Sequence, residues 1–522
     1  MTPQDNFRGV VKTSVLRRWL GVIALVAAMT VLRGAYAGLT DLRTDEAYYW
    51  TWSKENVLSF LDHPPMIAWF IRFGTTIFGD TSFGARFSGL VAMLLTQGLL
   101  ADMVWRVTRD VRAVITVVAM MEASLYYGLL MTKVSPDVPL VLFVTAMAWA
   151  LVRLAGSGDG RWWLAAGLFA GLAALSKFTI VLLLPAVLAF MWVPAWRGRW
   201  LRSPAPWVAA AIAVLLFTPV LVWNVQHDWA SFRFQAVRAT AAHPLELRTL
   251  GEFIGMQFGL VGFVLLPVVL TGVVLTAWRG YRRNEPVAIL LSTAVIVPFV
   301  YFLWKSLSLR VGDTWPTFIW PFGFAAAAIN LSMLRKEGWS ASFVAMSFRW
   351  ANIAIVSGIA FVVAVFFYYL AAPFNLIGRT DPVGGEAGYR PVIERTEAEL
   401  QKTGATWIAT TDYRTYAMLR WFFNGRVPVV QINERGRYQG FRVPDMSLIA
   451  GHVGLYVAPQ PYDSPAYPLW ALVPARREPL ETVDRVWRGI VMDTYAIEKF
   501  TGWMPELSPP PESPLFRWRV LA

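Results

Sequence analysis

The chain has 522 residues, of which 56% are apolar and only 16% are charged, so its composition excludes an ordinary soluble globular protein. It has no cysteine, which excludes disulfides and cysteine-based zinc sites. The 47 basic and 34 acidic residues give a net charge of +13. Membrane topology and anionic headgroups account for this excess more simply than a nucleic-acid partner does.

Long apolar stretches recur along the chain, and each approaches the roughly 20 residues that a helix needs to cross a bilayer. The first begins at Trp19 and follows a basic N-terminus, so it resembles a signal peptide, but we interpret it as a retained helix. The pattern predicts a polytopic α-helical membrane protein with about 11–13 transmembrane helices. The stretches are 19–38, 84–104, 113–131, 138–154, 162–176, 179–195, 207–223, 256–277, 287–304, 316–334 and 350–371.

Basic residues gather in alternate loops, and this bias predicts orientation. With the N-terminus inside, one set of loops is cytoplasmic and contains Arg106, Arg109, Arg112, Arg153, Arg161, Arg197, Arg199, Arg202, Arg279, Arg282, Arg283, Arg335, Lys336 and Arg349. The opposite loops contain Asp45, Glu46, Asp62, His63, Asp137, His227, Asp228 and Asp313. We therefore expect the acidic motifs and the C-terminal region on the extracytoplasmic side of the plasma membrane, the inner membrane of a bacterial cell.

The first outer loop, residues 39–83, contains the two most informative motifs, Asp45-Glu46-Ala47-Tyr48-Tyr49-Trp50 and Asp62-His63-Pro64-Pro65. Met66–Phe78 has the helical apolar spacing of a helix in the membrane interface. Such a helix would hold the acids near headgroup depth, where a carboxylate could accept a proton from an acceptor hydroxyl. The alternative is a solvated acidic face, although the paired prolines restrict the backbone conformation and favour a functional site over a solvated loop.

These residues resemble the first outer loop of C-type integral-membrane glycosyltransferases. The most similar group is the bacterial one related to dolichyl-phosphate-mannose protein mannosyltransferases and to the lipid A aminoarabinose transferase. The resemblance covers roughly residues 40–330. Further motifs agree in order, namely Ser135-Pro136-Asp137-Val138-Pro139-Leu140, Leu175-Ser176-Lys177-Phe178, Trp223-Asn224, His227-Asp228-Trp229 and Ser231-Phe232-Arg233-Phe234-Gln235.

The resemblance implies transfer of a sugar from a polyprenyl phosphate to an acceptor outside the membrane, with inversion at the anomeric carbon. It implies that Asp45 is the catalytic base and that Glu46 supports or positions it. This chain has Tyr48 where the aminoarabinose enzyme has Arg, and Asp62-His63-Pro64 where that enzyme has Glu-Lys-Pro. Both departures remove a fixed cation near the donor phosphate, which puts the family's mode of phosphate binding in doubt.

A departing lipid phosphate develops negative charge, so the site needs positive groups. Lys177, between two apolar segments, is the first candidate, and a snorkelling interfacial lysine is the alternative. The other predicted donor-phosphate or substrate-binding residues are His63, Arg310, Arg233, Tyr48 and Asp137. Asp62 with His227 could instead bind a divalent cation, or the two could simply form hydrogen bonds within their loops.

The composition becomes more polar from about Pro373, which divides the chain into a transmembrane domain (1–372) and an extracytoplasmic C-terminal domain (373–522). Helical character over Pro391–Thr403 and Tyr416–Phe423, with short strands at Thr406–Thr410 and Val427–Ile432, predicts an α/β or α+β fold. The domain ends in an extended Ser508–Pro511 segment and contains no motif that indicates catalysis.

The primary prediction is an inverting glycosyltransferase that uses a polyprenyl-phosphate sugar and a lipid, glycan or protein acceptor. We expect membrane lipid to contact the protein and expect no nucleic-acid partner. A transporter or flippase of a lipid-linked sugar is the alternative, and its main support is Glu122, an acid inside an apolar stretch. Glu122 could equally form a structural hydrogen bond or be uncharged. A receptor-like role for the C-terminal domain is a third hypothesis.

Overall fold

The computed structural model describes residues 3–240, 244–431, 435–442, 446–449, 451–460 and 476–501. The chain forms two compact units, and each is described by itself. Unit 1 consists of Met1–Gly38, Arg86–Pro219 and Ala242–Leu370. Unit 2 consists of Leu39–Ala85, Val220–Ala241 and Ala371–Ala522.

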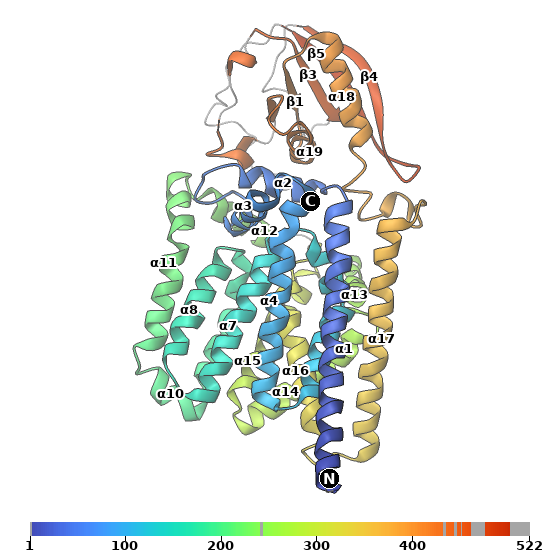
Figure 1. Ribbon diagram of the computed structural model, residues 1–522. Coiled ribbons are helices and arrows are strands. Elements are labelled where there is room, and N and C mark those ends of the chain that lie inside the picture. The colour runs from blue at the N-terminus through green and yellow to red at the C-terminus, as the bar shows by residue number, and fades with distance from the viewer. Residues whose placement is uncertain are drawn as a thin grey trace. The chain divides into compact units, whose positions relative to one another are not determined.

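The described residues of unit 1 form helices and connecting loops (Figure 1). The helices that lie wholly or mainly in this unit are α1 (Pro3–Leu39), α4 (Ser82–Thr108), α5 (Val111–Ala123), α6 (Leu125–Gly128), η1 (Leu130–Thr132), α7 (Asp137–Ser157), α8 (Arg161–Ala174), η2 (Phe178–Leu183), α9 (Leu184–Met191), α10 (Pro194–Trp200), α11 (Ala205–Gln226), α13 (Leu247–Val261), α14 (Leu265–Arg283), α15 (Pro286–Lys305), η3 (Thr317–Ile319), α16 (Trp320–Leu334) and α17 (Ala341–Ala371).

Among the described residues, seven helices are long and apolar enough to cross a membrane, and the number reaches ten if each of three bent helix pairs is one span. The predicted class, a polytopic helical membrane protein with a C-terminal region of mixed secondary structure, is confirmed. The number of spans is below the predicted 11–13. Ten of the predicted stretches correspond to these candidates, and the eleventh, 162–176, is the 14-residue helix α8, which is too short by length alone.

Local sequence explains the bends that reduce the count. Between α5 and α6 the chain turns by 79° at Ser124, whose extended backbone interrupts the helix and whose hydroxyl donates to the Leu260 carbonyl at 3.0 Å. Between α13 and α14 it turns by 97° at Gly262, whose φ of 130° is accessible only to glycine. Between α9 and α10 it turns by 102° before Pro194, which cannot continue a helix.

The helices of unit 1 approach closely where small residues face one another. A side chain at Gly272 of α14 would place its Cβ 2.6 Å from the Cα of Ala327 in α16, which is inside van der Waals contact. Helix α14 also packs against α15, and α7 packs against α8 (Figure 1). Close backbone approach through small residues is the usual way in which helices associate within a bilayer.

Glu122, which left the transporter hypothesis open, is fully buried at the end of α5. Its carboxylate forms an ion pair with Arg33 of α1 and accepts a hydrogen bond of 2.5 Å from the Gln97 side chain of α4. Arg33 also donates to the carbonyls of Tyr127 and Gly128 at 3.0 Å each. The two partners of Glu122, from α1 and α4, fit its structural interpretation, because they satisfy a buried acid without any transported ligand.

Residues 39–85 and 220–241 of unit 2 contain three helices that lie wholly within them, and its described residues from 371 onward contain a sheet with further helices (Figure 1). The helices are α2 (Thr44–Ser53), α3 (Met66–Phe78), α12 (Ala230–Thr240), η4 (Gly378–Thr380), α18 (Arg390–Thr403), α19 (Tyr413–Phe423), η5 (Arg435–Tyr438) and η6 (Met446–Leu448). The strands are β1 (Trp407–Thr410), β2 (Val429–Gln431), β3 (Gly454–Pro459), β4 (Arg476–Trp487) and β5 (Ile490–Thr501).

The sheet is mixed, with strand order β2-β1-β3-β5-β4. Strand β1 is parallel to β2 and β3, whereas β5 is antiparallel to β3 and β4, with Ala409 opposite Tyr456 and Val457 opposite Ile497. Its core contains Trp407, Ala409, Val430, Ile449, Tyr456, Ala458 and Phe500. The predicted strands and helices of this region lie close to β1, β2, α18 and α19; Ile432 and Ser508–Pro511 lie outside the described residues. The domain boundary near residue 373 stays a prediction.

Candidate functional site

The acidic pair of the first loop opens helix α2, where acids interact favourably with the positive end of the helix dipole. Glu46 is fully buried, and its carboxylate accepts a hydrogen bond of 3.0 Å from the backbone N–H of Arg43. This contact satisfies one of the backbone donors that a helix start leaves unpaired. Glu46 therefore holds the first turn of α2 in place, and the position of its neighbour Asp45 depends on that turn.

Asp45 is half-buried, and its carboxylate accepts a hydrogen bond from the hydroxyl of Tyr413 at 3.4 Å. Burial, followed by the charge of Asp45, raises the pKa of Tyr413 to about 12. Tyr413 thus remains a hydrogen-bond donor over the whole physiological range. It begins helix α19, which is capped by the Asp412 side chain through the backbone N–H groups of Arg414 and Thr415, at 3.1 and 3.0 Å.

The second motif of the loop forms a buried cluster around Asp62. The Tyr48 hydroxyl donates to Asp62 Oδ2 at 2.6 Å. Arg437, from η5 in the C-terminal region, donates through Nη1 to both carboxylate oxygens of Asp62, at 2.8 and 2.9 Å. Gln235 of α12 donates to the backbone carbonyl of Asp62 at 2.7 Å. The first loop itself and two segments that are distant in the sequence therefore fix the position of Asp62.

The charges of this cluster determine its protonation. Burial opposes ionisation of Asp62, but the Arg437 charge, the Tyr48 hydrogen bond and the His63 charge outweigh it, so the pKa of Asp62 lies below its ordinary value. Burial, reinforced by the Asp62 charge, raises the pKa of Tyr48 well above its ordinary value. At neutral pH the cluster thus contains an ionised acid, a protonated phenol and a guanidinium.

The surroundings of Asp45 and Asp62 are joined through aromatic rings. The Arg437 guanidinium lies 4.8 Å from the centre of the Tyr413 ring, and the Tyr48 and Tyr413 ring centres are 5.1 Å apart. His63 lies beside Tyr49, with ring centres 6.3 Å apart. Arg233, another predicted residue of this unit, is exposed on α12. Unit 2 thus brings together Asp45, Glu46, Tyr48, Asp62 and His63.

The predicted metal ligands both have protein partners. Asp62 is bound by Arg437 and Tyr48 as described, and His227 Nδ1 lies 2.7 Å from the Trp223 carbonyl oxygen with its ring stacked on that of Trp223, the centres being 4.3 Å apart. In the part of the chain that the structure describes, no group of three or more His, Cys, Asp or Glu could hold a metal ion. The geometry fits the alternative, hydrogen bonding within the loops.

The remaining predicted residues lie in unit 1. Lys177 and Asp137 are both buried, and Lys177 Nζ lies 2.8 and 3.0 Å from the two Asp137 carboxylate oxygens. Thr317 donates to the same carboxylate at 3.3 Å. This ion pair weakens the attraction that Lys177 would exert on a donor phosphate. Arg310 is 79% exposed and lies 3.9 Å from Glu252. The assignment of these residues to phosphate binding stays a prediction.

Sequence reasoning did not find Tyr413 and Arg437, the two C-terminal residues that contact the acids of the first loop. The predicted helix over 416–423 starts three residues late, so Tyr413 fell outside it. Arg437 lies in the run Arg435-Gly436-Arg437-Tyr438, where aromatic and basic residues alternate with glycine. Such a run is a modest signal of an anion-binding or polar contact, and only its position in the fold makes it specific.

The chain is similar in sequence to known glycosyltransferases. Residues 62–223 match the family model described as dolichyl-phosphate-mannose-protein mannosyltransferase. The chain is 28% identical over 309 residues to the lipid A galacturonosyltransferase RgtD of Rhizobium johnstonii, a match covering 54% of this chain and 62% of that one. It is 24% identical over 304 residues to the undecaprenyl phosphate-alpha-4-amino-4-deoxy-L-arabinose arabinosyl transferase 1 of Sodalis glossinidius, covering 54% of each chain.

The crystal structure of ArnT from Cupriavidus metallidurans bound to undecaprenyl phosphate is similar over nearly the whole molecule. The similarity covers 94% of this chain and 99% of that one, with a TM-score of 0.62 at 14% sequence identity. At this identity the likeness shows a shared fold. The matches to the two curated relatives span 62% and 54% of their lengths.

Proposed function

We propose that the chain transfers a sugar from a polyprenyl-phosphate donor to lipid A, because residues 62–223 match the model of the dolichyl-phosphate-mannose-protein mannosyltransferase family and the chain is similar to a lipid A galacturonosyltransferase. The observation that carries this proposal is the arrangement of Asp45. It is a half-exposed carboxylate at the start of α2, held by a tyrosine donor, with the Asp62–Arg437 pair in the same unit.

The names of the relatives support the donor and the acceptor. One relative is named for lipid A and galacturonic acid, and another for undecaprenyl phosphate and an aminoarabinose. Undecaprenyl phosphate is also the ligand named in the structure with the same fold. We infer that the donor of this chain is an undecaprenyl-phosphate sugar and that the acceptor is a lipid A hydroxyl or phosphate oxygen.

In the proposed reaction, Asp45 acts as the general base. Its carboxylate accepts the proton of the acceptor as that oxygen attacks the anomeric carbon. The bond between the anomeric carbon and the phosphate oxygen breaks on the opposite face, so the configuration inverts and the polyprenyl phosphate leaves with the electron pair. Tyr413 orients the carboxylate through its hydrogen bond, and Glu46 positions it through the first turn of α2.

The leaving phosphate needs positive charge, and Arg437 places a guanidinium beside the two positions where this chain departs from the aminoarabinose enzyme. Tyr48 and His63 occupy those positions: Tyr48 donates to Asp62, which pairs with Arg437, and His63 follows Asp62 in the chain. We propose that Arg437, with His63, supplies the cation that the first loop lacks, and that Lys177 is a second candidate; each of Arg437 and Lys177 is paired with a carboxylate, which weakens its attraction for a phosphate. A planar guanidinium is well suited to binding phosphate oxygens.

The site is proposed to work on the extracytoplasmic face of the bacterial inner membrane, because the basic residues of the opposite loops predict that orientation. The transporter alternative receives no comparable support. Its main feature was Glu122, and the described partners of Glu122 are protein groups.

The test is transfer by the purified full-length protein in vesicles, with lipid A and undecaprenyl-phosphate galacturonic acid or aminoarabinose, followed by mass spectrometry of lipid A. Asp45→Asn should lower the rate about 10²- to 10⁴-fold, the usual effect of losing a general base. Asp41→Asn is the matched control, because Asp41 lies on the same loop and is 51% exposed in a pair with Arg390. Full activity of Asp45→Asn would refute the assignment of the base, and absence of any product with either donor would refute the function.

A further inference from the structure

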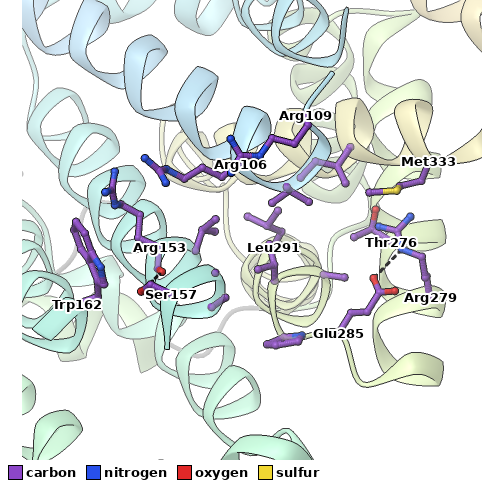
Figure 2. A pocket seen from close by; sticks show the side chains of 18 residues that line it. Arg106, Arg109, Arg153, Ser157, Trp162, Thr276, Arg279, Glu285, Leu291 and Met333 are labelled. Atoms are coloured by element: carbon purple, nitrogen blue, oxygen red, sulfur yellow. Dashed lines mark hydrogen bonds and ion pairs between the residues drawn. The ribbon is translucent and has the colours of Figure 1, made fainter. Parts of the chain in front are cut away.

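Unit 1 contains a pocket of about 400 Å³, a size typical of small-ligand sites, that neither the proposed reaction nor the family motifs involve (Figure 2). It lies near the C-terminal ends of α4, α7 and α14 and the N-terminal end of α15, with α16 completing the wall. We name it the arginine pocket, because four of its lining residues are Arg106, Arg109, Arg153 and Arg279.

The lining carries an excess of positive charge. Four arginines face one lining acid, Glu285, so the lining has a net charge of +3. Asp102 lies behind the lining, 2.6 Å from Arg106 and 3.8 Å from Arg153, and reduces this charge in part. Four cations around one cavity repel each other, and an anion in the cavity would relieve that repulsion.

Arg279 gives a second, independent indication of a ligand. Its side chain is 5% exposed, and its Nε lies 3.0 Å from a Glu285 carboxylate oxygen. Its Nη1 is buried and has no hydrogen-bond partner within the described ranges of the chain. A buried guanidinium donor without an acceptor is costly, and an anionic oxygen in the pocket would satisfy it.

The remainder of the lining is apolar. Leu291, Ile329 and Met333 form part of the wall, and Trp162 stands near Arg153, whose guanidinium lies 4.3 Å from the centre of the indole ring. In Figure 2, Leu291 lies between the side that carries Arg153 and the side that carries Arg279. A cavity with both arginines and an aliphatic wall suits a ligand that has an anionic group and an apolar part.

We propose that the arginine pocket binds a phosphate group presented by the headgroup of an anionic phospholipid. A free phosphate ester offers the same chemistry, and the experiment separates the two sources. The lining arginines belong to loops that the distribution of basic residues assigns to the cytoplasmic side, where anionic headgroups meet basic pockets between helices. The proposal does not rest on the proposed transferase activity.

The test measures lipid binding to the full-length protein by native mass spectrometry, with phosphatidylglycerol and phosphatidylcholine titrated separately. The pocket variant is Arg109→Gln combined with Arg153→Gln, two residues that are not fully buried. The matched control is Arg112→Gln combined with Arg282→Gln, which removes the same charge from neighbouring helix ends but outside the lining. Arg279→Lys, which keeps the charge beside Glu285 but removes the planar fork, is a milder second variant.

We expect wild type and control to bind phosphatidylglycerol more tightly than phosphatidylcholine. The pocket variant should bind it about 10- to 100-fold more weakly, because each charge-assisted hydrogen bond contributes about tenfold. The affinity of Arg279→Lys for phosphatidylglycerol should lie between those of the wild type and the pocket variant. If inorganic phosphate alone binds with the same dependence on the arginines and phosphatidylglycerol does not, the ligand is a free phosphate ester. Equal binding of both lipids with no phosphate binding, or equal losses in the pocket variant and its control, would overturn the proposal.

Discussion

Arg437→Gln is the substitution that best tests how the C-terminal region is joined to the first loop. Removing one partner of a buried ion pair costs about 3–5 kcal/mol, because the other charge remains buried. The Arg437 side chain is 25% exposed and that of Asp62 is 10% exposed, so solvent relieves part of this penalty. We therefore expect the contact between η5 and the loop to weaken by about 2–3 kcal/mol, which raises the local opening constant about 30- to 150-fold.

The effect should depend on pH in a defined direction. In the wild type the pKa of Asp62 is lowered, so ionised Asp62 stabilises the folded state above its unfolded pKa of about 3.9, and this contribution is lost as pH falls through the lower folded value. In Arg437→Gln, burial is no longer opposed by the Arg437 charge, and protonation of Asp62 removes the energetic cost of a buried carboxylate without its cation. The difference between wild type and variant should therefore be largest near neutral pH and shrink below about pH 5.

Hydrogen exchange of the peptide spanning residues 435–442, followed by mass spectrometry, measures this opening. Asp62→Asn and the double variant Asp62→Asn/Arg437→Gln complete a cycle, in which the double variant should recover about 2 kcal/mol relative to the sum of the single changes. Arg442→Gln is the control, because it removes an exposed arginine from the same segment. Strictly additive single effects, or a difference that is unchanged between pH 7 and pH 4, would refute the reasoning.

Three further outcomes are expected. Tyr413→Phe should lower the transfer rate about tenfold by removing the donor that orients Asp45, and an unchanged rate would contradict the positioning role. Because the pKa of Tyr413 is about 12, wild-type activity should show no loss due to this tyrosine between pH 8 and 10. Lys177→Met should lower the free energy of unfolding by about 3–5 kcal/mol, because Asp137 is left buried without its partner, and Lys177→Met/Asp137→Leu should lower it by less. Tryptophan fluorescence during unfolding in detergent measures both, and a double variant less stable than the single one would contradict this. Gly272→Val should prevent close packing of α14 on α16 and lower the melting temperature, whereas a wild-type melting temperature would show that the helices separate at little cost.

Much of the fold follows from sequence pattern alone. The family resemblance is supported by the family match over residues 62–223, which includes the Asp62-His63-Pro64-Pro65 motif and begins after Asp45-Glu46. The apolar helix at Met66–Phe78 has the predicted bounds, because its amphipathic spacing is strong and prolines precede it. The number of spans was predicted too high, since hydropathy did not show that the helix in 162–176 has only 14 residues, nor that bends at Ser124 and Gly262 divide two other candidates.

The site is harder to predict than the fold. The acids of the first loop are recognisable from their motifs, but Tyr413 and Arg437 contact them across 368 and 375 residues of chain. Strands β4 and β5 were not predicted either, because charged residues interrupt the alternation of β4. Contacts with partners that are distant in the sequence determine the positions of Tyr413 and Arg437, and pairing with β5, rather than burial or local propensity, holds β4 in the sheet.

The contact between Arg437 and Asp62 also has a consequence for biosynthesis. The first loop is made early, yet the residues that orient its two acids are synthesised more than 360 residues later. A nascent or truncated chain therefore has Asp45 without Tyr413 and Asp62 without Arg437. An incomplete chain that already contains the first loop would not have the assembled site, so any activity of that site has to wait until Tyr413 and Arg437 have been synthesised.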